Sequence, residues 1–165
     1  MAERENDTQM NWKIETDEIA RRRQLALKQG GADAIAKHHS KGRLTIRERI
    51  EKLLDPGSFE EVGPSAGAAN HAESGELIGF DPANFVLGFG KIEGRRIVIG
   101  GEDFTMKGGS PSPAGLRKSV YAEELAVQYK LPLVRLHEGS GGSVGGTGGK
   151  SPSLPGPVNA PARFR

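Results

Sequence analysis

The sequence contains no cysteine among its 165 residues. That absence excludes a disulfide framework, a thiolate nucleophile and a zinc site with sulfur ligands. Long apolar runs are also missing, since no window approaches the roughly 20 apolar residues that a membrane helix needs. The start of the chain, MAERENDTQMNW, is too acidic and polar for a secretion or transit signal. The sequence therefore predicts a cytoplasmic protein with no membrane partner.

The chain also lacks an excess of either charge. Its 23 lysines and arginines face 21 aspartates and glutamates, which gives a net charge of +2 at pH 7. The two signs are interleaved except at Arg21–Arg23, so a nucleic-acid partner is not expected. Aromatic residues are scarce at 5%, whereas 24 glycines and 10 prolines indicate many loops. A length of 165 residues fits one ordinary domain.

Three helices are expected in the N-terminal third. An irregular apolar period over residues 12–29 predicts a surface helix, and a short helix follows over 32–39. The next helix has the clearest signal, because Thr45 and Glu48 form a capping box that satisfies free N–H groups at a helix start. The apolar face of this helix is Ile46, Ile50, Leu53 and Leu54, and its stop signal is Asp55-Pro56-Gly57.

Strand patterns begin after a long loop that we expect over residues 63–82. FVLGFGKI and RRIVIGGED flank Glu93-Gly94, a tight turn with glycine where positive φ is needed, which predicts a β-hairpin or two adjacent strands. Residues 114–130 are typical of a helix. LPLVRLHE at 131–138 then predicts a short buried strand, parallel to an earlier one across that helix. Strand, helix, strand and glycine-rich loop together predict an α/β fold.

The glycine-rich stretch His137–Ser151, HEGSGGSVGGTGGKS, has three interpretations. Its Gly-Lys-Ser end resembles a nucleotide-binding P-loop, but Val144 stands where the first glycine belongs, and four prolines in the next twelve residues exclude the required helix. A flexible linker is the second interpretation. The third is an oxyanion site at Ser140–Ser143, because glycine lets backbone N–H groups turn towards a ligand with no Cβ in the way.

Several segments, in order along the chain, carry a family resemblance. They are KHHSKGRLTIRERIEKLLDPGSFEEVG, GFGKIEGRRIVIGGEDFTMKGGS with its Asp-Phe-Thr and Gly-Gly-Ser elements, Lys118 in the following helix, and LHEGSGGS. Together they resemble the carboxyltransferase (β-type) subunits of biotin-dependent acyl-CoA carboxylases, the family of the propionyl-CoA and acetyl-CoA carboxylase β chains. The resemblance implies a crotonase-like α/β fold.

The resemblance also implies a reaction, the transfer of a carboxyl group from carboxybiotin to the α-carbon of an acyl-CoA thioester. In such a reaction the enolate oxygen needs fixed N–H donors, and by resemblance these are the backbone N–H groups of Gly142 and Ser143. Biotin's own ureido group is thought to take the proton, so the missing cysteine is no obstacle. The implied partners are a biotin carboxylase, a biotin carrier subunit and further copies of the chain in a hexamer.

The residues expected to contact substrate are Gly141 in the loop, and Arg22 and Lys118 at the coenzyme A phosphates. For the two cations a solvated surface position is the plainer alternative. No metal is expected in this part of the chain, because adjacent His38 and His39 diverge around a helix. Asp103-Phe104-Thr105 is expected to fix a loop rather than to do chemistry.

Two features depart from the family pattern. Gly139 stands where the family has Asp, and Ser143-Val144 replaces Ala-Arg, which puts loop anchoring and substrate type in question. Family subunits are also several times longer, so these residues alone are not expected to complete an active site. The expected segments are 1–57, N-terminal helices; 58–150, the start of the crotonase-like domain; and 151–165, a proline-rich loop. A non-catalytic CoA-ester or partner-binding remnant and a nucleotide-binding domain are the alternatives.

Overall fold

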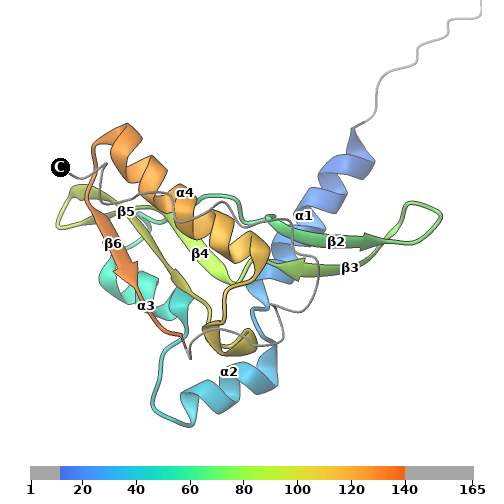
Figure 1. The fold of residues 1–165 in the computed structure, drawn as a ribbon, viewed down its shortest axis with the longest axis horizontal. Helices are drawn as coiled ribbons and strands as arrows, with labels where there is room; N and C mark the ends of the chain where they lie inside the picture. Colours follow the sequence, from blue (N-terminus) through green and yellow to red (C-terminus); the bar gives the residue numbers. More distant parts are fainter. Residues whose placement is uncertain (1–11, 140–165) are drawn as a thin grey trace, which may run out of the picture.

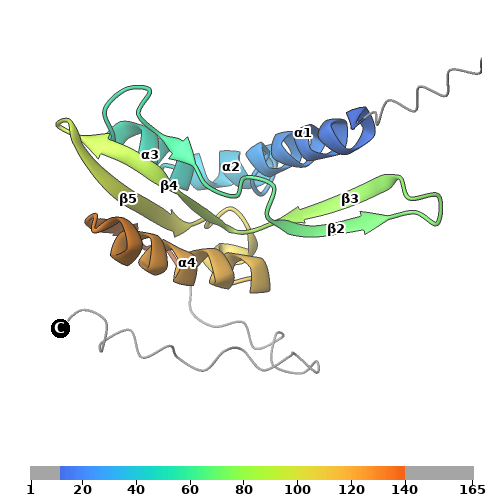
Figure 2. The same cartoon turned by 90° about the horizontal axis from the view of Figure 1, so that it is seen from above.

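The computed structural model describes residues 12–139, which form a mixed sheet covered by helices on both faces (Figures 1 and 2). The helices are α1 (Lys13–Leu27), α2 (Ala32–His39), α3 (Ile46–Leu53), the short 3₁₀ turn η1 (Lys107–Gly109) and α4 (Pro113–Tyr129). The strands are β1 (Glu60–Glu61), β2 (Gly67–His71), β3 (Leu77–Pro82), β4 (Phe85–Ile92), β5 (Arg95–Glu102) and β6 (Leu133–Leu136). Within this part of the chain, no helix is long and apolar enough to cross a membrane.

The main sheet has four strands in the order β1-β4-β5-β6. Strands β4 and β5 form the expected antiparallel hairpin, and the turn residues Glu93 and Gly94 both have positive φ. Strand β6 returns after α4 and lies parallel to β5, as the sequence predicts. It is half-buried rather than buried, because β5 is its only strand neighbour within residues 12–139.

Alternating residues of the β4–β5 hairpin pack into two separate hydrophobic cores, one on each face of the sheet. On one face, Val86, Ile97 and Ile99 pack against α3. On the other face, the buried residues Phe85, Leu87 and Val98 pack against Ala122, Leu125 and Ala126 of α4. Figure 2 shows α3 and α4 on opposite sides of the sheet. The period-2 alternation of strand side chains therefore joins both helices to one hairpin.

The capping box of α3 is confirmed. Thr45 N–H donates to Glu48 Oε2 at 2.7 Å, and the Thr45 hydroxyl accepts from Glu48 N–H at 3.4 Å. Ile46, Ile50 and Leu54 are buried, but the prediction for Leu53 is wrong, since it is 40% exposed. Leu54 already follows the helix with extended backbone, so it reaches the sheet while Leu53 turns to solvent.

The loop expected over residues 63–82 is wrong for most of its length. Strands β2 and β3 pair there in a two-stranded antiparallel sheet, with a register shift between Asn70 and His71. The residues of β2 are small or polar, and those of β3 do not alternate between apolar and polar, so the pattern that marks a strand is absent from the sequence. Most residues of both strands are not buried. Figures 1 and 2 show this hairpin beside α1, extending away from the main sheet. The segment boundary expected at residue 57 stays a prediction, although α3 shares its core with the sheet.

A substitution at Thr45 tests whether the capping box of α3 contributes to the stability of the fold. Thr45→Ala deletes the hydroxyl that accepts from Glu48 N–H, so we expect a loss of about 1 kcal/mol of unfolding free energy in denaturant titration. Thr45→Ser retains the hydroxyl and serves as the control, with a smaller loss. Equal losses for the two variants would show that the buried methyl group matters and the cap does not.

Candidate functional site

The candidate site lies at the carboxyl end of β6, where His137, Glu138 and Gly139 lead into the glycine-rich stretch. The expected oxyanion donors Gly142 and Ser143, and the expected substrate contact Gly141, lie outside the described residues. The described site is therefore the support from which that stretch begins. A loop that follows a parallel strand at the edge of an α/β sheet is a frequent place for ligand binding.

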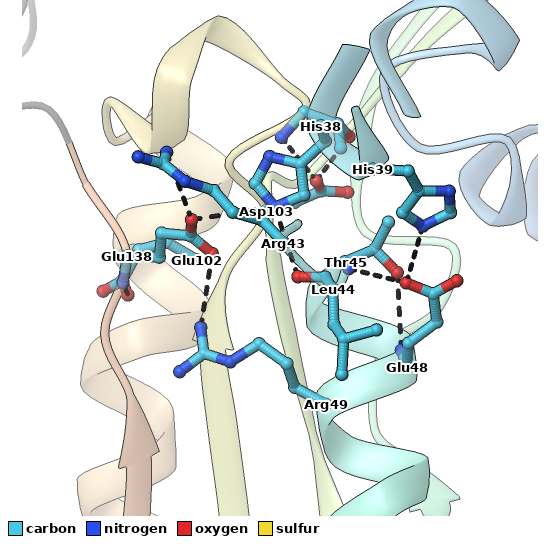
Figure 3. Close-up of polar contacts among 11 residues, drawn as sticks. His38, His39, Arg43, Leu44, Thr45, Glu48, Arg49, Glu102, Asp103 and Glu138 are labelled. Atoms are coloured by element: carbon cyan, nitrogen blue, oxygen red, sulfur yellow. Dashed lines mark hydrogen bonds and ion pairs between the residues drawn. The ribbon is translucent and has the colours of Figure 1, made fainter. Parts of the chain in front are cut away.

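Two arginines and one histidine surround the Glu138 carboxylate (Figure 3). Arg49 Nη1 donates to Glu138 Oε2 at 3.4 Å. Arg43 Nη1 and His38 Nε2 lie 3.7 and 3.6 Å from Oε1. The carboxylate is 20% exposed, so these contacts are partly shielded from water. His38 comes from the end of α2, Arg43 from the loop that follows and Arg49 from α3, and together they attach this segment to the end of β6.

The backbone of Glu138 is held as well. Its N–H donates to Glu102 Oε2 at 3.2 Å, which joins the ends of β5 and β6. Glu102 also accepts from His137 Nδ1 at 3.3 Å and lies 3.8 Å from Arg135 Nη2. Arg135 in turn donates to Ser119 Oγ at 2.6 Å and to Glu123 Oε1 at 3.2 Å on α4. The strand end is thus bound to β5, α3 and α4 together.

Gly109 in η1 lies directly against the start of the loop. A Cβ placed on Gly109 would lie 2.2 Å from Glu138 O and 3.1 Å from Gly139 Cα. Its φ of +72° is also one that glycine adopts without strain. The Gly-Gly-Ser segment of the sequence therefore lets two backbones approach closely beside the candidate site.

Asp103 fixes the turn that leads into η1, which agrees with the expected role of Asp103-Phe104-Thr105. Asp103 is 3% exposed, and its Oδ1 accepts from the N–H and the hydroxyl of Thr105. Burial raises the pKa of Asp103, and the two hydrogen bonds from Thr105 oppose that shift. Thr105 Oγ1 also accepts from Gly30 N–H at 3.0 Å, so the turn holds the start of α2.

The two histidines diverge as expected. His38 is buried, and its Nε2 donates to Leu44 O at 3.2 Å, while His39 Nε2 contacts Glu48 Oε2 at 2.9 Å (Figure 3). Within residues 12–139, no group of three or more His, Asp or Glu residues has an arrangement that would hold a metal ion. His38 therefore belongs to the support of Glu138, and His39 belongs to the cap of α3.

Lys118 is not the surface charge that was the plainer reading of the sequence. It is 8% exposed, and its Nζ donates to Gly63 O at 3.2 Å and lies 4.0 Å from Glu61 Oε1. Burial lowers the pKa of Lys118 to about 8, Glu61 opposes this shift, and Arg47 adds to it. The cation lies inside the fold because α4 packs its inner face against β4 and β5.

Arg22 lies in α1, where its guanidinium pairs with Glu18. Glu18 also contacts His71 Nε2 at 3.1 Å, so the pair joins α1 to the β2–β3 hairpin. Hydrogen bonds from His71 and Arg22 lower the pKa of Glu18. Its neighbours Arg21 and Arg23 are exposed, as expected for a solvated helix face. Within residues 12–139, Arg22 makes no hydrogen bond or ion pair with Lys118 or Glu138.

Comparison with known proteins identifies the family. The family model of the carboxyl transferase domain matches residues 37–151. The chain belongs to this carboxyl transferase family. The propionyl-CoA carboxylase carboxyltransferase subunit of Haloferax mediterranei is 33% identical over 128 residues, which are 78% of this chain and 25% of that protein. The probable biotin-dependent acyl-coenzyme A carboxylase beta2 subunit of Mycobacterium tuberculosis is 38% identical over 126 residues, 76% of this chain and 22% of that protein.

Solved structures of carboxyl transferase proteins confirm the crotonase-like α/β fold. Transcarboxylase 12S, a hexamer assembly with methylmalonyl-coenzyme A and methylmalonic acid bound, has a TM-score of 0.66 at 31% identity, covering 78% of this chain and 25% of that one. The geranyl-CoA carboxylase beta subunit of P. aeruginosa has a TM-score of 0.63 at 28% identity, covering 80% and 24%. The chain thus spans about a quarter of the length of these relatives.

Glu138, Arg43 and Arg49 are site residues that the sequence analysis did not single out. They lie within the family segments, but the contact between Arg49 and Glu138 joins positions 89 apart in sequence. Local patterns do not indicate which distant residue a surface arginine meets. The one available signal was a carboxylate beside Gly139, the position at which the sequence departs from the pattern expected by resemblance.

The buried charge on Lys118 predicts a specific pH dependence. Below pH 8 the Lys118 amine is protonated in both the folded and the unfolded protein. The folded protein then bears the full free-energy cost of burying the charged amine. Between about 8 and the ordinary value of 10.5, the unfolded lysine binds more protons, so the wild type gains stability over Lys118→Met as pH rises. Denaturation at pH 7, 8, 9 and 10 measures this difference. Lys52→Met, at an exposed lysine, should show a flat difference, and a flat profile for Lys118→Met would contradict the assignment.

Gly109→Ala tests the close contact at the start of the loop. The added methyl group meets Glu138 O, so we expect a loss of unfolding free energy beyond the strain of positive φ. Gly57→Ala is the matched control, because Gly57 has the same φ of +72° and open space around it. If both variants lose the same free energy, measured by denaturant titration, the contact with Glu138 contributes nothing.

Proposed function

We propose that this polypeptide is the N-terminal part of an acyl-CoA carboxylase carboxyltransferase, and that it takes part in carboxyl transfer from carboxybiotin to the α-carbon of an acyl-CoA. The observation that carries the proposal is the family match over residues 37–151, which runs through the glycine-rich loop. The fixed end of β6 supports it, because a loop that presents N–H donors needs a rigid base.

The role of the chain in this reaction is to stabilise negative charge. The backbone N–H groups of Gly142 and Ser143 are proposed to donate to the thioester oxygen as the α-carbon loses its proton, and Gly141 is proposed to contact the substrate. Carboxybiotin would supply the carboxyl group: its N–C bond would break, the ureido group would take the α-proton, and the α-carbon would bond to the released carbon dioxide. No side chain within residues 12–139 is assigned to biotin.

The proposed partners follow from the complexes to which the relatives belong. Those proteins include biotin-dependent carboxylase subunits and the hexameric transcarboxylase 12S. For this chain we propose a biotin carrier subunit, a biotin carboxylase and a hexamer of carboxyltransferase chains. The donor and the remaining parts of the site would then come from outside the described residues.

The earlier assignment of Arg22 and Lys118 to coenzyme A phosphates is not favoured by their surroundings. Lys118 is 8% exposed and bonded to Gly63 O, and Arg22 is paired with Glu18. A phosphate would have to displace these partners and, at Lys118, reach a buried amine. If this chain binds the phosphates of an acyl-CoA, exposed lysines or arginines without a carboxylate partner are better placed to contact them than Arg22 or Lys118.

A substitution at Ser143 tests the proposal in the full native polypeptide with its partner subunits. Malonyl-CoA or methylmalonyl-CoA should release carbon dioxide in the presence of biotin. Ser143→Pro removes one N–H donor, and we expect a rate about a hundredfold to a thousandfold lower. Ser143→Ala retains the donor and restores the family's residue, so its rate should stay near that of the wild type.

The main alternative is a remnant that binds CoA esters without turnover, which the departures at Gly139 and Val144 favour. Under that alternative the folded, assembled protein binds coenzyme A but releases no carbon dioxide from either malonyl-type substrate. That result would rule out the catalytic proposal. The family match favours both of these functions over nucleotide binding, and stabilisation by ATP but not by coenzyme A would reverse that order.

A further inference from the structure

Two lysines without a carboxylate partner meet in one pocket beside the candidate site. The pocket has a volume of about 280 Å³ and lies between α2 and the turn from Phe104 to Gly108. Lys37 and Lys41 line it together with Ala34, His38, Phe104, Thr105 and Gly108. No acidic residue is in this lining, and among the described residues neither ammonium group has an ion pair.

The position of the two lysines at the end of α2 would normally disfavour an anion, because free helix carbonyls carry partial negative charge. Here the last carbonyls are already used. Ala36 O accepts from Ser40 N–H, and Lys37 O accepts from Ser40 Oγ. His38 O accepts from the N–H groups of Lys41 and Arg43, and His39 O accepts from Gly42 N–H. The two ammonium groups therefore set the local potential at the pocket.

Two carboxylates near the pocket do not neutralise it. Asp103 lies behind Thr105, whose N–H and hydroxyl both donate to Asp103 Oδ1. Glu138 already faces Arg43, Arg49 and His38, three groups for one negative charge. Arg43 also lies over the Phe104 ring, 5.5 Å from its centroid, so it adds a further cation to this wall. Positive charge exceeds negative charge around the pocket even with His38 neutral.

Other exposed cations in the described structure are less suited to an anion. Lys107 and Arg117 both line a second pocket of about 160 Å³, but the acidic residue Asp81 lines that pocket too. Arg22 and Lys118 are engaged, as described above. The α2 pocket is thus the place where two unpaired lysines converge with no acidic side chain between them.

We propose that Lys37 and Lys41 bind a phosphate group of the substrate, which is a coenzyme A ester if the proposed function holds. The pocket is smaller than the roughly 300–1,000 Å³ of sites that enclose a whole drug-sized ligand, so it suits one end of a longer molecule. It also lies beside the loop, since Gly108 lines it and Gly109 packs against Glu138. Lysine is a frequent phosphate ligand as a point charge.

The test compares two double variants of the full native polypeptide by calorimetry at physiological salt. Lys37→Gln/Lys41→Gln removes the pocket charges, and Lys28→Gln/Lys52→Gln removes two exposed charges elsewhere. We expect coenzyme A to bind the pocket variant at least tenfold more weakly, the scale of a lost hydrogen bond to a charged group. The control variant should bind like the wild type, and pantetheine, which lacks phosphate, should bind all three proteins alike.

Each result has a distinct meaning. Equal coenzyme A affinity for the two double variants would overturn the inference. Weaker binding of inorganic pyrophosphate to the pocket variant, in a protein that does not bind coenzyme A, would support the phosphate site and count against the proposed function. Intact coenzyme A binding without carboxyl transfer would count against the catalytic proposal alone. Both lysines are exposed, so all variants should keep the wild-type melting temperature within a few degrees.

Discussion

The pairing of β4 with β5 is the constraint on which the other elements depend. Both faces of this hairpin are buried, one under α3 and one under α4, so a register slip by one residue would exchange the two cores. The turn is itself held by Asp55, whose carboxylate accepts from the N–H groups of Glu93 and Gly94 at 2.9 and 2.8 Å. The stop signal of α3 therefore also fixes the hairpin, and β6 pairs with β5 in the register that results.

The elements that sequence reasoning predicted correctly are those whose signals are local. The capping box, the Glu93-Gly94 turn and the apolar strands each lie within a few consecutive residues. The β2–β3 hairpin has no such signal, because its residues are mostly not buried and it lies beside α1 rather than over the main core. The exposure of Leu53 also depended on a change to extended backbone at Leu54 that helical periodicity does not contain.

The candidate site was less predictable than the fold, because its support consists of charged residues that are far apart in sequence. The family resemblance located the loop and its departure at Gly139, but not what replaces the missing carboxylate. In the structure Glu138, one residue earlier, has two arginines and His38 around its carboxylate, and its backbone N–H donates to Glu102. Glu138 lies two residues past the end of β6, and its contact with Arg49 anchors this end of the strand to α3.

Whether a cation can serve a ligand depends on what already neutralises it. Arg47 donates to both oxygens of Glu61 at 2.8 and 3.0 Å, and Lys118 shares that carboxylate, so these charges are engaged inside the fold. If Arg47 or Lys118 turned to a phosphate, the partly buried Glu61 carboxylate would lose a partner. The free energy lost there would exceed the free energy gained from an exposed contact with the phosphate. Lys37 and Lys41 lose only water when an anion arrives. The division between cations that hold the sheet to its helices and cations that remain free therefore limits where this surface can bind phosphate.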